Sequence, residues 1–511
     1  MKRNICLKEI ANLRKEYSDV FLLLLFNSII CEFRNRDRKV VDMAQGVLYA
    51  FSKLIAQIKI DSKNVYPFYL DTPFCNKIKD KLYTSMYSLY NYDYKELLKR
   101  KDNGKISNSQ MGYELSSPKS YPNIFIINLY TRLKPFESLI KQKWNLEIED
   151  ISSGIKTIEI KYEKDYSALE YFSKKTWCID GVFPVKFMDD LINSNKNAAK
   201  FYCFNKSTLC PILKREENYF VLNFDLFIDS IYNNIIKCLM LDKTESEKSE
   251  LGKIKGEVFN EYCGTVLKKS FIASKIFYNY QYSVDNKKGE IDIVLIDKDV
   301  LILCECKNRN YSHSSMGEND DYLKYDAESF DKATAQVLDP VNYLKNKGIL
   351  KLRKKGLSDL VLNKENYNYV IPLVFNLENL GELNFDYKNR NNNLCYFSLD
   401  DITTIVEIIK KRSYLFVDFI SQLSDKDKFE KEVTDDLMNV FVYYLVHIDL
   451  DDLYTGNVNL KYYANKYLEK HFNTINNNEV IDSISPNLSK NIFSESCTYK
   501  CLIQQIHKFN K

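Results

Sequence analysis

Residues 289–307 read GEIDIVLIDKDVLILCECK, two alternating apolar runs on either side of a short polar break. Alternation with a period of two around a turn is typical of an antiparallel β-hairpin. A two-residue turn at 298–299 sets a register in which Asp292 lies opposite Glu305. Opposed residues of such a pair have side chains about 5 Å apart on one face. The pattern therefore predicts that two carboxylates meet at the open end of the hairpin.

These charged residues need a partner, because an unpaired carboxylate in apolar surroundings has a raised pKa or costs stability. Asp292 and Glu305 offer hard oxygen ligands and the carbonyl of Cys306 a third, a set that suits Mg²⁺ or Mn²⁺. Lys307 follows Glu305 by two residues and projects to the same side. A cation beside an ammonium suits phosphate chemistry, because both stabilise developing negative charge. An ordinary exposed ion pair is the alternative interpretation.

The segments around the hairpin extend the pattern. A helix is expected at 255–268, where apolar residues recur at helical spacing and Glu257 and Glu261 stand one turn apart. The other expected segments are a strand at 276–284, a loop at 308–320, a helix from about residue 322 with Lys332 and Gln336 on one face, and a strand at 367–377.

This order of helix, strand, strand with Asp292, strand with Glu305-Cys-Lys307, helix and strand resembles the PD-(D/E)xK, or restriction-endonuclease-like, nuclease superfamily. The resemblance covers residues 253–377, with an extension to about residue 411. It implies an α/β fold with a mixed sheet flanked by helices. The usual proline before the acid is absent, and Gly-Glu-Ile-Asp stands in its place, a form familiar in the superfamily.

The resemblance also implies a role for each matching residue. Glu261 is the rival of Glu257 for the acidic position of the first helix. The matches are Glu257 as the first-helix acid, Asp292 and Glu305 as metal ligands with the Cys306 carbonyl, Lys307 as the catalytic lysine, and Gln336 as the polar residue of the later helix.

The function implied by the resemblance is a Mg²⁺- or Mn²⁺-dependent nuclease that hydrolyses phosphodiester bonds of nucleic acid. DNA is the expected partner, and restriction or defence is the setting by analogy alone. One alternative is a protein that keeps the nuclease fold without catalysis, as a nucleic-acid-binding protein or scaffold. Another is a chance resemblance in an interaction protein. An aspartate, a glutamate and a lysine at mutually consistent positions favour the enzyme.

Composition limits the classes of partner. The chain has 511 residues, of which 73 are Lys or Arg and 69 are Asp or Glu, so its net charge is only +4. The molecule is not a polycation, and any nucleic-acid surface must be local. The densest basic cluster lies at 350–355 and is expected to be a solvated loop, with phosphate contact as the alternative.

Cysteine use and hydropathy indicate the compartment. Thirteen cysteines occur without regular spacing, which indicates reduced thiols in a cytoplasmic protein. The most apolar run, residues 20–31, is too short to span a bilayer, so no membrane partner is expected.

Four regions are expected along the chain. The N-terminal half carries no recognisable chemistry, which leaves it as the region for a protein partner or an oligomer. The regions are a mainly helical one at 1–101, a mixed α/β one at 123–242 with strands at 155–162 and 219–222 and a helix at 224–241, the nuclease-like domain at 250–411, and a helical one at 412–511. Residues 243–255 are expected to be a linker, and Ser398 is expected to cap a helix through residue 409.

Overall fold

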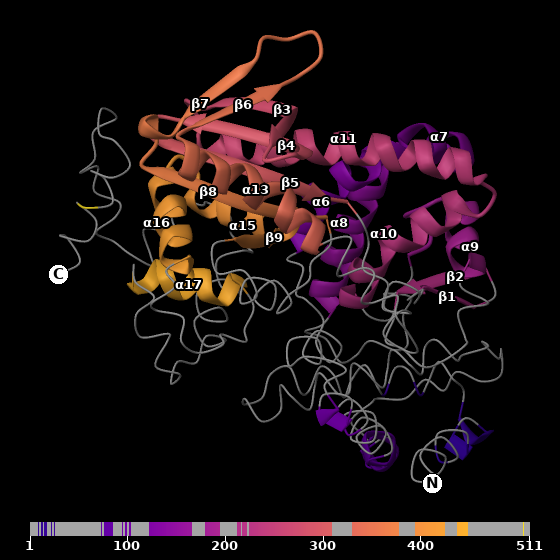
Figure 1. Cartoon of the computed structure of the whole chain (residues 1–511). Helices are drawn as coiled ribbons and strands as arrows, with labels where there is room; N and C mark the ends of the chain where they lie inside the picture. The colour runs from indigo at the N-terminus through magenta and orange to yellow at the C-terminus, as the bar shows by residue number, and fades with distance from the viewer. Residues whose placement is uncertain are drawn as a thin grey trace. The chain divides into compact units, whose positions relative to one another are not determined.

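A computed structural model of the whole chain describes residues 122–165, 179–194, 212–215, 217–221, 224–308, 330–377, 394–424 and 437–447 (Figure 1). It also describes residue 504 and, before residue 104, several short pieces and single residues. Most of the helical region expected at 1–101 lies outside the described residues. The chain divides into two compact units. The first comprises Met1–Pro122, Arg132–Leu251 and Met316–Glu318, and the second comprises Asn123–Thr131, Gly252–Ser315 and Asn319–Lys511.

The described part of the first unit is mostly helical, with one small hairpin. Its core contains the indole of Trp144, which lies edge-on to Phe187 and donates a 2.8 Å hydrogen bond to Asp190. Its elements are η1 (Lys134–Phe136), α7 (Glu137–Trp144), α8 (Ile148–Asp165), α9 (Val185–Ser194), β1 (Ile212–Arg215), β2 (Asn218–Val221) and α10 (Phe224–Met240). The strand expected near 219–222 and the helix expected at 224–241 are thus observed.

The strand expected at 155–162 is wrong, because these residues belong to α8. Their local alternation is part of a longer pattern in which the buried residues are Ile148, Ile151, Ile155 and Ile158. Spacings of three and four place these side chains on one helical stripe, while Ile160 is exposed. The helical spacing of the buried isoleucines, and not the local alternation of residues 155–162, therefore determines the structure.

The linker expected at 243–255 contains the boundary between the two units, at Leu251 and Gly252, but it is not a loop, since α11 runs unbroken over Glu245–Ser270. Its start is fixed by a reciprocal cap. The Thr244 backbone N–H donates to the Glu247 carboxylate at 2.8 Å, and the Glu247 N–H donates to the Thr244 hydroxyl at 3.3 Å. This Thr-x-x-Glu capping box lowers the pKa of Glu247 to about 2, chiefly through the Thr244 backbone bond. A charged stretch that is poor in apolar residues therefore begins a helix here.

The second unit is built on a mixed seven-stranded sheet with the order β7-β6-β3-β4-β5-β8-β9 (Figure 1). The pairs from β7 to β5 are antiparallel, and the pairs β5 with β8 and β8 with β9 are parallel. The strands are β3 (Lys275–Val284), β4 (Lys287–Asp297), β5 (Val300–Lys307), β6 (Ile349–Arg353), β7 (Leu360–Asn363), β8 (Tyr369–Asn376) and β9 (Cys395–Ser398).

The central hairpin has the predicted register. Asp297 pairs with Val300, and the pairing continues outward to Ile293 with Cys304. Lys298, in the two-residue turn, has φ of +52°, a conformation that asparagine and glycine adopt more readily than lysine. On the other side of β4, Asp285 and Asn286 both have positive φ, as a type I′ hairpin turn requires.

The basic cluster at 350–355 is not a loop, because most of it forms β6. Leu350 and Leu352 are buried, and Lys351 and Arg353 alternate with them on the exposed side. The strand pairs with both β3 and β7. The sequence prediction considered only the charges of the segment and overlooked its alternation of buried and exposed residues, which is typical of a strand.

Helices complete the second unit. α13 (Lys332–Lys347) packs on β5, β8 and β6, and it connects toward the β6–β7 hairpin that precedes β8. Ser398 caps α15 (Leu399–Ile409) through a capping box with Asp401, as predicted. α16 (Ser413–Leu423) and α17 (Leu437–His447) follow. Among the described helices, none is long and apolar enough to cross a membrane.

A segment from the N-terminal half also belongs to this unit. α6 (Pro122–Leu133) contributes residues 123–131. Its buried Asn128 donates a 2.6 Å hydrogen bond to Asp400 and accepts one from Thr403 at 3.0 Å and one from the Tyr262 hydroxyl at 3.2 Å. Such a satisfied amide ties α6, α11 and α15 together.

Candidate active site

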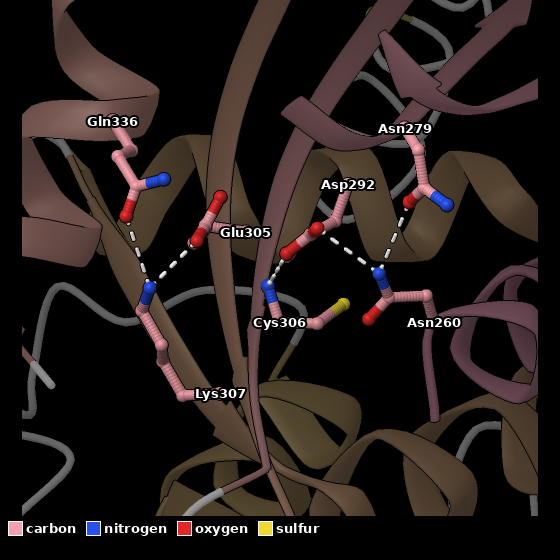
Figure 2. A network of polar contacts seen from close by, with 7 residues as sticks. All are labelled: Asn260, Asn279, Asp292, Glu305, Cys306, Lys307 and Gln336. Atoms are coloured by element: carbon pink, nitrogen blue, oxygen red, sulfur yellow. Dashed lines mark hydrogen bonds and ion pairs between the residues drawn. The ribbon is translucent and has the colours of Figure 1, made fainter. Parts of the chain in front are cut away.

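Polar side chains from five elements of the sheet unit meet where the β4–β5 ladder ends (Figure 2). Asp292 comes from β4, Glu305, Cys306 and Lys307 come from β5, and Gln336 comes from α13. Asn260 of α11 and Asn279 of β3 lie on the other side of Asp292 (Figure 2). All five residues expected from the hairpin and the later helix are therefore brought together.

Asp292 is held by donors on both of its oxygens. The backbone N–H of Cys306 donates to Oδ2 at 2.7 Å, and the Asn260 Nδ2 donates to Oδ1 at 3.0 Å. The last β4–β5 pair is Ile293 with Cys304, so the Cys306 N–H bonds a side chain of the neighbouring strand instead. The carboxylate of Asp292 is thereby fixed relative to the strand that carries the other acid.

β3 is interrupted opposite Asp292. Tyr278 pairs with Ile293 and Tyr280 with Ile291, and Asn279 between them has φ of +58°. A non-glycine residue in this conformation costs of the order of 1 kcal/mol or more and persists only where its surroundings fix it. Here the Asn279 Oδ1 accepts a 3.2 Å hydrogen bond from Asn260 Nδ2. The bend gives one amide access to Asn279 and Asp292 together.

Glu305 is buried, with 4% of its surface exposed, and its two oxygens have different environments. Oε1 forms an ion pair of 2.6 Å with Lys307 Nζ. Lys307 also donates to the Gln336 Oε1 at 3.0 Å, so both acceptors fix the direction of the ammonium. Within the described residues, Oε2 of Glu305 has no hydrogen-bond donor. A buried carboxylate oxygen without a donor is costly and indicates a missing cation or proton.

The electrostatics of the two acids agree with this geometry. The pKa of Glu305 is raised to about 8, first by burial and then by the nearby charge of Asp292, while Lys307 acts in the opposite direction. Burial also raises the pKa of Asp292, against the opposing effects of the Cys306 N–H, Lys307 and Asn260. The two carboxyl groups lie close enough to share a hydrogen bond when one is protonated. Two neighbouring carboxylates disfavour each other's charged form, so a proton or a cation that they share stabilises the pair.

The donor set fits a small, hard divalent cation. In the described part of the chain, no three His, Cys, Asp or Glu side chains surround a common point. Mg²⁺ needs fewer, because it is commonly held by one or two carboxylates and completes its shell with water and substrate phosphate. Asp292 and the donor-free oxygen of Glu305 supply that number. The Cys306 carbonyl as a ligand stays a prediction.

The first-helix acid is the expected site residue that this cluster does not include. Glu257 and Glu261 both lie on exposed positions of α11. The α11 residue that contacts Asp292 is Asn260, three positions after Glu257 and 8% exposed. Sequence reasoning missed it by considering only acids, although a polar residue beside Phe259 in the apolar stripe is a signal of a buried polar contact.

Comparisons of the chain with protein-family models, with curated proteins and with solved structures find no match.

Proposed function

We propose that this chain is a metal-dependent nuclease of the restriction-endonuclease-like, PD-(D/E)xK type that hydrolyses phosphodiester bonds, with DNA as the expected substrate. The observation that carries the proposal is the buried pair of Asp292 and Glu305, in which one carboxylate oxygen has no donor among the described residues. The order α11, β3, β4, β5, α13 and β8 around this pair supports it, with the β6–β7 hairpin inserted before β8.

Mg²⁺ or Mn²⁺ bound by these acids supplies Lewis-acid polarisation of the phosphoryl oxygen and a lower pKa for water. The protein's own contribution is orientation. The Cys306 N–H and Asn260 fix both oxygens of Asp292, so this ligand needs little reorganisation during the reaction. Preorganised groups of this kind account for a large part of enzymatic rate enhancement.

Lys307 has the geometry of a positioned charge. Glu305 and Gln336 accept from its Nζ at 2.6 and 3.0 Å, and 17% of its side chain is exposed. Its ammonium is therefore held beside the acid pair and still meets solvent. In the proposed reaction Lys307 orients the attacking water or stabilises the charge that develops on the phosphate. Gln336 acts as a positioning residue through Lys307.

The experiment is cleavage of supercoiled, linear and single-stranded DNA and of RNA by the purified full chain, with Mg²⁺, Mn²⁺ or EDTA. Metal-dependent cleavage of DNA that is lost in Asp292→Asn and retained in Glu250→Gln is the expected result. Glu250 is an exposed acid in the same helix as Asn260 and makes a matched control.

Two other outcomes contradict the proposal in different ways. DNA binding without cleavage in either metal would favour the inactive nuclease-fold protein. Cleavage by Asp292→Asn at the parental rate would point to a contaminating nuclease or to another site.

A further inference from the structure

A groove of about 760 Å³ opens between β3, β4 and β6, at the end of β4 that leads to Asp292. Its wall is made of polar and apolar surface in about equal parts and carries three basic side chains. The lining residues are Gln281, Tyr282, Ser283, Lys288, Gly289, Glu290, Lys351 and Arg353.

Strand register explains why these residues share one wall. Gln281 pairs with Glu290 on one side and with Arg353 on the other, which makes a row across three strands. Ser283 pairs with Lys288 in the next row. Gln281 and Ser283 are exposed, whereas the residues that alternate with them in β3 are buried. The wall is thus the solvent face of this part of the sheet.

The groove leads to the acid pair. Glu290 and Lys288 precede Asp292 by two and four residues on β4, which corresponds to about 7 and 13 Å at the usual rise of a strand. One strand of duplex DNA carries roughly four phosphates over about 13 Å of the helix axis.

Basic residues outnumber acidic ones in the groove and on the hairpin beside it. Lys288, Lys351 and Arg353 line the groove together with Glu290, and Lys354, Lys355 and Asp359 lie between β6 and β7, so five basic and two acidic residues give a net charge of +3. The β6–β7 hairpin that carries most of them projects beyond the rest of the sheet (Figure 1).

The acid on this hairpin does not block an incoming phosphate. Asp359 lies 2.7 Å from Lys351 and 3.9 Å from Arg353. The side chains of the two basic residues are 51% and 71% exposed. Exposed ion pairs contribute at most about 1 kcal/mol and exchange readily for another anion. Lys288 makes no ion pair within the described residues.

We infer that this groove binds the sugar-phosphate backbone of duplex DNA and leads one strand toward Asp292 and Glu305. Lys288, Lys351 and Arg353 are its phosphate contacts, and the β6–β7 hairpin is its outer arm. The inference deepens the proposed nuclease function and rests on it for the direction of the strand. Binding itself requires no catalysis.

The experiment measures anisotropy of a fluorescein-labelled DNA duplex in EDTA, with the full chain, over a series of salt concentrations. Each phosphate contact contributes a slope of about 0.9 in log affinity against log salt, or roughly fivefold in affinity near 0.15 M salt. Lys288→Ala is expected to weaken binding about fivefold and the Lys351→Ala, Arg353→Ala double variant about 30-fold, with proportionally smaller slopes. Lys268→Ala, an exposed lysine of α11, is the control and is expected to bind like the parent.

Asp359→Asn separates loss of contact from loss of folding, because it is expected to tighten binding by freeing Lys351 and Arg353. No binding by the parent, or equal affinities and salt slopes in all groove variants, would overturn the inference. Binding that follows these expectations without any cleavage in Mg²⁺ or Mn²⁺ would support the groove and contradict the proposed hydrolysis. If the parent cleaves DNA but the groove variants bind it normally, the proposed hydrolysis would be supported and the groove contradicted.

Discussion

Oδ2 of Asp292 accepts a 2.7 Å hydrogen bond from the backbone N–H of Cys306, so the strand that carries Glu305 and Lys307 also orients the acid of the neighbouring strand. This bond replaces a rung of the ladder and cannot be lost by a side-chain change at Cys306. The other oxygen of Asp292 depends on one side chain, Asn260. The two contacts therefore differ in how readily they can be tested.

Asn260→Ala is expected to weaken Mn²⁺ binding and metal-dependent cleavage while the protein still folds. The variant removes the donor to Asp292 and leaves Asn279 Oδ1 without its partner, which costs about 1–3 kcal/mol of unfolding free energy. Cleavage rate against Mn²⁺ concentration, with thermal unfolding as the folding control, checks both effects. Excess Mn²⁺ should recover part of the rate if Asn260 acts through Asp292. An unchanged metal requirement would make the amide purely structural.

Lys307→Ala is expected to reduce single-turnover cleavage by roughly 10²-fold with little change in DNA affinity. The ammonium is one positioned charge beside the acids, whereas affinity depends on many phosphate contacts. Gln336→Ala should have a smaller effect in the same direction, because it only loosens Lys307. Lys268→Ala is the matched control. A Lys307→Ala variant that cleaves at the parental rate would remove the lysine from the mechanism.

Burial of Glu305 predicts a pH-dependent stability of the metal-free protein. Its pKa is raised from 4.5 to about 8, so between these pH values the folded state binds more protons than the unfolded state. The free energy of unfolding in EDTA should therefore fall as pH rises through this window. Urea unfolding of the parent and of Glu305→Gln across the window checks the sign. Stability that falls equally in the variant would assign the effect to other groups.

Two glycines make a matched pair for stability. A Cβ on Gly289 would lie 2.5 Å from the Tyr282 hydroxyl, and Tyr282 is 5% exposed, so Gly289→Ala should destabilise the sheet. Gly252 in α11 has open space around its Cβ position, and Gly252→Ala should stabilise the helix by roughly 0.5–1 kcal/mol. Denaturant midpoints measure both changes. Equal effects of the two substitutions would contradict the close approach of Tyr282.

The central hairpin could be predicted from sequence because its alternation is long, apolar and bounded by charges that fix which ends meet. Its register then brought Asp292 and Glu305 together without further information. The capping box at Ser398 was predictable for a similar reason, since both of its partners lie within four residues. Short-range patterns with a single physical solution carry most of this information.

The remaining elements depended on context that a local pattern lacks. Residues 155–162 alternate, yet the buried isoleucines of α8 show their helical spacing only over residues 148–158, most of which precede this segment. Charge at 350–355 concealed two buried leucines of β6. Asn260 could not be assigned, because its role depends on a bend in β3 that only the folded sheet reveals.

The account rests on the claim that Asp292 and Glu305 together hold a divalent cation, and Mn²⁺ titration calorimetry of the full chain tests it most directly. The parent should bind a stoichiometric Mn²⁺ and, near neutral pH, release a proton from the acid pair, detectable as a dependence of the heat on buffer ionisation. Asp292→Asn and Glu305→Gln should each lose this binding, and Glu250→Gln should retain it. A parent that binds no Mn²⁺, or two site variants that bind it as the parent does, would contradict the claim.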